Sequence, residues 1–342
     1  SRVPTAARCV DGQLAHTSHG QDRPRAVANA GCSKLMTTPA QWVAGARPRT
    51  LPAAVVPVAV GSAVAYFNGF SVNGFSACIR IVLALLVALA LQVGVNYSND
   101  YSDGIRGTDE VRVGPIRLVG QGLADPSAVK KAALLSFLVA CVCGAILVLL
   151  TQAWWLLIVG VLAVAAAWFY TGGPRPYGYA GLGEVFVFVF FGLVAVVGTT
   201  FVLTGQIQLL AVILAIPVGL LACALLVINN LRDIPGDTKV GKNTLAVRLG
   251  DARTRELYGF CLWAPFAIAA IVGLGGIGFV SLFPKGALIA VVAIPIAVIP
   301  WRKVTSGAVG PALIEVLGWT GRIQLIYGLL LTIGIVATRV AS

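Results

Sequence analysis

Long apolar runs constrain this chain more than any other feature of its sequence. We count about nine of them, each near the roughly 20 apolar residues that a bilayer-crossing helix requires. Of the 342 residues 58% are apolar and 11% charged, against roughly 25% charged residues in a soluble domain. The pattern predicts an all-α integral membrane protein, with one transmembrane domain over residues 39–342. The expected spans are residues 50–68, 78–99, 130–151, 153–171, 182–204, 209–231, 256–280, 285–301 and 322–340.

The first 38 residues have a different character. They are polar and rich in Gly, Pro, Ser and Arg, and they lack the continuous apolar stretch of a secretory signal peptide. We therefore expect residues 1–38 to be a disordered extension or leader that takes no part in the fold.

The charges between the spans predict an orientation. Basic residues follow the second, sixth and eighth expected spans, whereas the intervening connections hold few. The positive-inside rule then places the N-terminus in the cytoplasm and the C-terminus outside. For a multi-pass protein of the cell (plasma) membrane, the net charge of +12 indicates loops beside anionic lipid. It does not indicate nucleic-acid binding, because no basic stripe with interleaved aromatic residues accompanies it.

Histidine and cysteine usage excludes several kinds of site. The chain has two histidines, His16 and His19, and both lie in the polar leader. No pair of its cysteines has CxxC spacing. A histidine triad, a haem ligand or a zinc cage in the membrane domain is therefore excluded or disfavoured.

A first cluster of acids and amides, residues 96–103, ends the second expected span. At helical spacing Asn96, Asp100 and Asp103 share one face, and Asn99 lies beside it. Acids at a helix C-terminus face the negative end of the helix dipole, so they call for a compensating cation. A divalent metal that carries a phosphate-type ligand is the natural candidate.

A second cluster, residues 229–237, follows the sixth expected span. Asn230 and Asp233 again share a helix face. Pro235 is expected to end the helix, so that Asp237 belongs to a long connection over 232–255 and folds back toward Asp233. Two facing clusters of this kind could hold Mg²⁺ ions bridged by a diphosphate. The alternative is that these acids only pair with neighbouring Arg and Lys side chains in solvated loops.

Four segments resemble one family. The stretch 99–119 resembles the first aspartate-rich motif of the UbiA-type intramembrane prenyltransferases, and within them the branch that prenylates 1,4-dihydroxy-2-naphthoate. The segments 42–52, 170–179 and 229–250 agree with it in the same order, so the resemblance covers about residues 40–340. The superfamily pattern has a further Asp four residues after Asp103. Here that position is Gly107 and the next acid is Asp109.

The resemblance implies nine helices around a central cavity, with a polar cap on the cytoplasmic side that binds Mg²⁺ and a polyprenyl diphosphate. It assigns Asp100, Asp103, Asp233 and Asp237 as catalytic metal ligands. It implies that the following residues bind the substrates: Asn96, Asn99, Arg106, Asn230, Lys239, Lys242, Arg49, Arg175 and Tyr170. For the basic residues, the basic character of cytoplasmic loops is an alternative explanation.

The implied reaction is the transfer of a polyprenyl chain to 1,4-dihydroxy-2-naphthoate, with loss of CO₂ and diphosphate, giving demethylmenaquinone. Metal and cations would stabilise the departing diphosphate, and an apolar, π-lined cavity would shelter the allylic cation. Tyr97, Tyr101, Trp168, Phe169, Tyr170 and Phe186 are candidates for its wall.

Other functions stay open. A prenyltransferase of the same fold could use hydroxybenzoate, homogentisate or a sugar phosphate as acceptor. The spacing of Asp100, Asp103 and Gly104 resembles the opening of a CDP-alcohol phosphotransferase motif, but the following residues do not continue it. A transporter would place charges near the bilayer midplane. Here the charges lie at span ends and in loops.

Overall fold

Helices account for all the regular structure in the computed structural model of the chain, which describes residues 37–71, 74–107, 116–275 and 283–341. No strand occurs in these ranges, which confirms the all-α prediction. The extension expected over residues 1–38 lies outside the described part, except for Thr37 and Thr38. Residues from Met36 onward form a unit of their own, and the following description concerns that unit.

The described helices follow the order of the predicted spans. They are α1 (Pro39–Gly45), α2 (Pro52–Phe67), α3 (Phe75–Ile105), α4 (Pro126–Thr151), α5 (Leu156–Phe169), α6 (Gly183–Val187), α7 (Ala195–Thr204), α8 (Leu209–Lys239), α9 (Leu245–Gly273), α10 (Ile294–Thr305) and α11 (Pro311–Ala341). A π-helical stretch, Phe188–Val194, joins α6 to α7, and 3-10 turns cover Pro48–Thr50, Tyr177–Ala180 and Lys285–Ala293.

The count of membrane spans is lower than predicted. Seven described helical segments are long and apolar enough to cross a bilayer, and the pair Pro39–Thr50 and Pro52–Phe67, bent by 51°, can supply an eighth. The expected fourth span is α5, which has only 14 residues. At 1.5 Å per residue it is roughly 21 Å long, which is less than the roughly 30 Å hydrocarbon core. The structure therefore supports seven or eight spans in its described part, and nine is not established.

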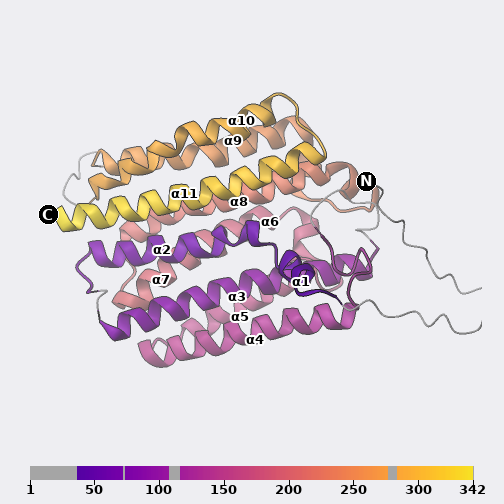
Figure 1. The fold of residues 1–342 in the computed structure, drawn as a ribbon. Helices are drawn as coiled ribbons and strands as arrows, with labels where there is room; N and C mark the ends of the chain where they lie inside the picture. Colours follow the sequence, from indigo (N-terminus) through magenta and orange to yellow (C-terminus); the bar gives the residue numbers. More distant parts are fainter. Residues whose placement is uncertain (1–36, 72–73, 108–115, 276–282, 342) are drawn as a thin grey trace, which may run out of the picture. The chain divides into compact units, whose positions relative to one another are not determined.

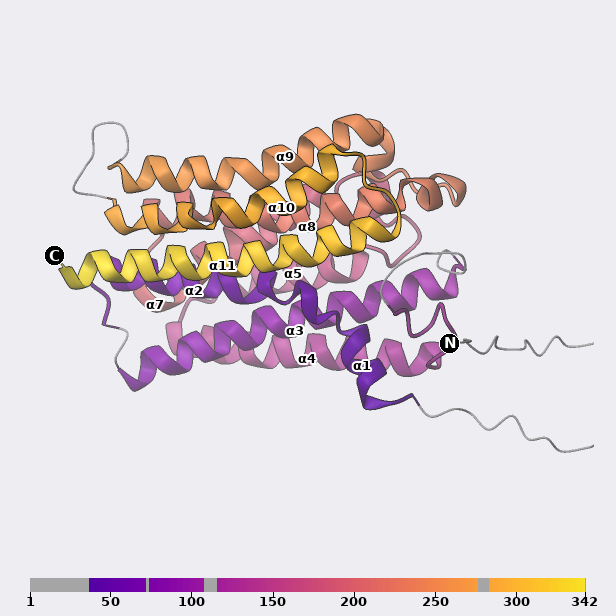
Figure 2. The same cartoon turned by 45° about the horizontal axis from the view of Figure 1, so that its top comes forward.

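Successive long helices run in opposite directions, so their connections gather at the two ends of the bundle (Figure 1). The connections after α3, α5, α8 and α10 lie at the same end as α1, whereas α11 ends at the other (Figures 1 and 2). We call the first of these the polar end and define it by residues 37–51, 116–125, 170–182, 240–244 and 306–310. Both acid-amide clusters point to this end, because α3 and α8 finish there.

The bundle is organised around α8. In the most apolar part of this helix 72% of the residues are buried. The helix packs against α9, α11, the π-helical stretch and α7. Leu214, Leu221 and Ile228 on α8 are fully buried. In contrast, α4 and α5 expose large apolar side chains, with Leu135 62% and Ile158 66% exposed. A continuous apolar outer face of this kind suits contact with lipid.

Two glycines allow a close approach between helical segments of the bundle. Gly286, in the 3-10 stretch before α10, faces Gly334 of α11. A Cβ atom added at either position would lie 1.9 Å from the carbonyl oxygen of the other. Small residues allow such close packing of helices within a bilayer, where van der Waals contact drives association.

The predicted end of the sixth span and the predicted start of the seventh are both wrong, because both helices are longer than expected. The helix α8 passes through Pro235 and ends at Lys239, and α9 begins at Leu245, so the expected connection over 232–255 shrinks to residues 240–244. Pro235 removes one hydrogen bond within the last two turns of α8, which does not end a helix that the bundle holds in place. Asp237 therefore lies on the helix and not in a loop, four residues after Asp233 and on the same face.

Candidate active site

Two side chains of α3, Gln92 and Asn96, hold the segment between α1 and α2 in place. The Gln92 amide donates to Thr50 Oγ1 at 2.8 Å, and Asn96 Nδ2 donates to Ala46 O at 2.9 Å. Both Gln92 and Asn96 are buried. Asn96 therefore lies where the resemblance implies, but its amide nitrogen is occupied by the neighbouring backbone.

Asp100 holds the connection that follows α3. Its side chain is 1% exposed, and its two carboxylate oxygens accept the backbone N–H groups of Leu118 at 2.7 Å and Val119 at 3.1 Å. Asp100 does not belong to the cavity wall described below. The structure thus shows Asp100 clamping a loop, and its direct role as a metal ligand stays a prediction.

We expect Asp100→Asn to lower the stability of the polar end. An asparagine offers one acceptor oxygen, so its NH₂ group must face one of the two N–H donors. The loss of a hydrogen bond to a charged group costs about 1.5–3 kcal/mol, which a lowered Tm of the detergent-purified protein measures. Asp251→Asn, a change at an exposed acid on α9, is the control. Lost activity with an unchanged Tm would contradict the clamp and favour direct ligation.

Asp103 is the charged centre of the site. It is 4% exposed and pairs with Lys242 at 3.0 Å and with Arg117 at 3.6 Å. The Tyr179 hydroxyl also donates to its carboxylate. Burial, with Asp103 beside it, raises the pKa of Tyr179, so the phenol stays protonated and acts as a donor. Three connections of the polar end therefore meet at one carboxylate.

The α8 cluster faces the same site. Asp233 is 8% exposed and binds Arg232 through two hydrogen bonds of 2.8 Å. Arg232 also donates to Asn229 at 2.8 Å. Asn230 Nδ2 donates to Glu184 Oε1 at 3.0 Å. The cluster is thus partly neutralised by its own arginine.

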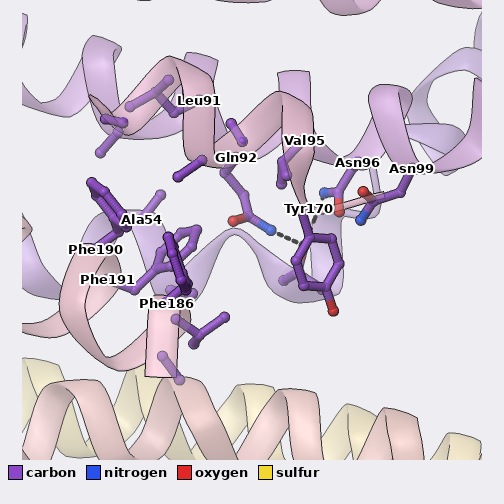
Figure 3. A pocket seen from close by; sticks show the side chains of 18 of the residues that line it. Ala54, Leu91, Gln92, Val95, Asn96, Asn99, Tyr170, Phe186, Phe190 and Phe191 are labelled. Atoms are coloured by element: carbon purple, nitrogen blue, oxygen red, sulfur yellow. Dashed lines mark hydrogen bonds between the residues drawn. The ribbon is translucent and has the colours of Figure 1, made fainter. Parts of the chain in front are cut away.

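A cavity of about 1080 Å³ joins the two clusters. Figure 3 shows Gln92, Asn96, Asn99 and Tyr170 toward one side of it, and Phe186, Phe190 and Phe191 on the other. Its charged and amide wall consists of Arg47, Arg49, Gln92, Asn96, Asn99, Asp103, Arg117, Asn229, Asn230, Arg232, Asp233, Asp237 and Lys242. Apolar residues, many of them small, line most of the rest, and they come from α2, α3, α4, α5, the π-helical stretch and α7. One space therefore has a charged mouth and an apolar body.

Several residues implied by the resemblance lie elsewhere. Arg106 donates to the carbonyl oxygens of Thr171 and Gly173 and does not belong to the cavity wall. Lys239 and Arg175 are exposed and also lie off the wall. Asp109 falls within residues 108–115, outside the described part. Of the aromatic candidates, Trp168, Tyr170 and Phe186 line the cavity, whereas Tyr97, Tyr101 and Phe169 do not.

Four residues at the site were not predicted. Arg117 and Tyr179 lie inside the matching motifs, but nothing in their spacing showed that they converge on Asp103. Arg232 lies within the second cluster, in which only the acids and amides were expected to act. Glu184 sits in an apolar run, and an acid there is itself an uncommon feature that could have indicated a functional role.

The donor set fits a hard cation. Among the described residues no three His, Cys, Asp or Glu side chains form a ready metal cage. Mg²⁺ does not require one, because it binds through one or two carboxylates together with water and substrate phosphate. The oxygens of Asp103, Asp233, Asp237 and the cavity amides suit this mode of binding. Arg232 Nη1 is buried and has no hydrogen-bond partner in the described structure, so it can meet an anion.

Membrane-length helices, a charged mouth and an aromatic, apolar body define the class of intramembrane prenyltransferases. The chain belongs to the UbiA prenyltransferase family, whose model matches residues 54–306. It is 48% identical over 294 residues to the 1,4-dihydroxy-2-naphthoate octaprenyltransferase of Mycobacterium tuberculosis, covering 86% of this chain and 96% of the relative. The Escherichia coli protein of the same name is 38% identical over 239 residues, covering 68% and 76%.

A solved structure shares the fold. It is that of a UbiA homolog from Archaeoglobus fulgidus bound to GPP and Mg²⁺. It has a TM-score of 0.58 and 15% sequence identity, and the match covers 87% of this chain and 99% of that one. At this level of identity the similarity supports the helical architecture and no residue role.

Proposed function

We propose that this protein transfers a polyprenyl group from polyprenyl diphosphate to 1,4-dihydroxy-2-naphthoate in a Mg²⁺-dependent reaction. CO₂ and diphosphate are lost, and demethylmenaquinone forms in its reduced, dihydroxy state. The observation that carries the proposal is that Asp103 of α3 and Asp233 and Asp237 of α8 line one cavity with an aromatic, apolar body. The names of the relatives support this choice of acceptor.

The charged mouth favours departure of the diphosphate. Mg²⁺, when bound through Asp103, Asp233 and Asp237, supplies Lewis-acid stabilisation of the phosphate oxygens. Lys242, Arg117 and Arg232 line the same wall and add fixed positive charge where negative charge develops. The C–O bond breaks with its electron pair going to the diphosphate, and an allylic cation remains.

The body of the cavity protects that cation. Phe186, Phe190 and Tyr177 place aromatic rings together, with centroids 4.0 Å apart for Tyr177 and Phe186. The negative face of such rings attracts a cation, and the apolar wall excludes water. A ring carbon of the naphthoate then forms the new C–C bond. The carboxylate leaves as CO₂, and its bonding pair returns to the ring, so no histidine base is required.

The acceptor's carboxylate needs a cation at the mouth. Arg47 and Arg49 line the cavity from the α1–α2 segment and suit this role. Arg47 adopts a left-handed backbone conformation, with φ of 54°, which turns the chain between α1 and the following 3-10 turn. The position of Arg47 before α2 also suits an interfacial anchor for that helix.

The polar end faces the cytoplasm in this proposal, and the protein resides in the cell membrane. Arg49, Arg175 and Lys242 lie at the polar end, whereas the described basic residues near the opposite end are Arg80, Lys285 and Arg339. By the positive-inside rule the basic end is cytoplasmic, so the C-terminus of α11 lies outside. The naphthoate and the diphosphate head group of the prenyl donor would then reach the mouth of the cavity from the cytoplasmic side.

We expect purified protein to transfer radiolabelled prenyl groups to 1,4-dihydroxy-2-naphthoate with release of CO₂, and to lose this activity on chelation of Mg²⁺. Hydroxybenzoate and homogentisate serve as competing acceptors. Prenylation of one of these alone would overturn the choice of acceptor. Flux of an ion or solute across proteoliposomes without prenyl transfer would favour the transporter alternative.

A further inference from the structure

Glu184 is a buried acid that the proposed reaction does not use. It lies in the first turn of α6 and is 8% exposed. Its backbone oxygen accepts from the Cys223 thiol at 3.2 Å, which ties this turn to α8. Glu184 does not belong to the cavity wall, but its hydrogen-bond partner Asn230 does.

In the hydrogen bond between Asn230 and Glu184, Asn230 is the donor. A carboxylate only accepts hydrogen bonds, so the NH₂ group of Asn230 must face Glu184. The 3.0 Å bond from Asn230 Nδ2 to Glu184 Oε1 has this sense. The amide oxygen of Asn230 is then directed away from Glu184. Asn230 and Asp233 are three residues apart on α8 and so share a face.

The charge of Glu184 is not explained by packing. Its second oxygen, Oε2, is buried and has no hydrogen-bond partner in the described structure. A buried acceptor left unsatisfied costs about 1–3 kcal/mol. An apolar side chain would avoid this cost, but it would leave the orientation of the Asn230 amide unfixed. Tyr170 packs against the preceding residue, Gly183, because a Cβ there would lie 3.2 Å from the Tyr170 ring.

We infer that Glu184 is a positioning residue for the Mg²⁺–diphosphate site: it orients Asn230 so that an amide oxygen, and not an NH₂ group, lies beside Asp233. The inference rests on the proposed function and deepens it. Outer partners that orient a ligand in this way typically change metal affinity or activity by 10–100-fold when replaced.

The test uses Glu184→Gln, which keeps the shape and removes the charge. The first readout is binding: the rise in Tm of detergent-purified protein with geranyl diphosphate as Mg²⁺ is titrated. We expect the Mg²⁺ concentration at half effect to rise about tenfold or more in Glu184→Gln. The second readout is the Mg²⁺ dependence of prenyl transfer, which should shift equally.

A swapped pair separates positioning from folding. In Glu184→Gln with Asn230→Asp, the amide at 184 donates to one carboxylate oxygen at 230, and the other oxygen is directed as in the original protein. We expect this double variant to recover most of the lost Mg²⁺ affinity. If Glu184→Gln does not accumulate, the swap is compared with Asn230→Asp, which opposes two carboxylates and should be the weaker binder.

Gln324→Leu is the matched control. Gln324 of α11 is fully buried, its amide atoms have no hydrogen-bond partners in the described chain, and it lies off the cavity wall. Its replacement should leave Mg²⁺ dependence unchanged. Unaltered Mg²⁺ dependence in Glu184→Gln, or a swap no better than its comparison variant, would overturn the inference and leave the proposed function standing. Absence of any Mg²⁺ effect in the original protein would remove both.

Discussion

Replacement of Asp103 or Asp233 by asparagine is expected to reduce prenyl transfer by two to three orders of magnitude. Each carboxylate is buried at the cavity wall, where charge acts more strongly than in water. Removing one such stabilising group from a preorganised site typically costs 10²–10³-fold in turnover. The measurement is the initial rate of radiolabelled prenyl transfer in membranes that contain equal amounts of protein.

The control for these variants is Glu315→Gln, since this acid on α11 is exposed, pairs with Lys303 and lies off the cavity wall. Asp103→Asn also removes the carboxylate with which Lys242 and Arg117 both pair, so its Tm must be measured beside its rate. A folded Asp233→Asn protein of normal rate, together with an active Asp103→Asn protein, would remove the site assignment.

Gly334→Ala should be among the most destabilising single changes in the bundle. Its new methyl group would lie 1.9 Å from Gly286 O, a backbone atom that no side-chain rotation can move. Overpacking typically costs about 1–3 kcal/mol and occasionally more, and here α11 must shift as a whole. We expect a lowered Tm and a reduced yield of folded protein in detergent.

Gly318→Ala is the matched control, because Gly318 lies on the same helix and a Cβ there meets no atom within 4 Å. It should keep or slightly raise stability, since alanine favours the helix. Gly286→Ala should lower the Tm in the same way, because its methyl group would lie 1.9 Å from Gly334 O. Equal Tm values for Gly334→Ala and Gly318→Ala would contradict the described approach of the two segments.

Much of the fold follows from apolar periodicity and length, since each predicted run falls in a helical segment. The exceptions have local causes. The helix α5 is too short to count as a span by length, because a left-handed Gln152 precedes it and the Gly172-Gly173-Pro174 turn follows. Pro235 does not end α8 because the surrounding bundle holds the helix, a tertiary effect that a single sequence does not encode locally.

Site residues could be predicted where they lie close together in the sequence, and not where the fold brings distant residues together. The acid-amide spacing identified Asp103 and Asp233, which line the cavity. Asp100 accepts two backbone N–H groups, whereas Asp103 meets side chains from three connections, and sequence spacing gives no information on this difference. Arg117 and Tyr179 come from two separate connections and Glu184 comes from α6, so their roles required the three-dimensional structure.

The position of Asp103 has a consequence for how the site responds to substrate. Arg117, Tyr179 and Lys242 come from three different connections and share this one acceptor. A cation that binds this carboxylate therefore competes with one contact from each of the three connections at once. The three donors that lose Asp103 lie where an arriving diphosphate could accept their hydrogen bonds. The substrate-free and substrate-bound sites would then differ by an exchange of hydrogen-bond partners.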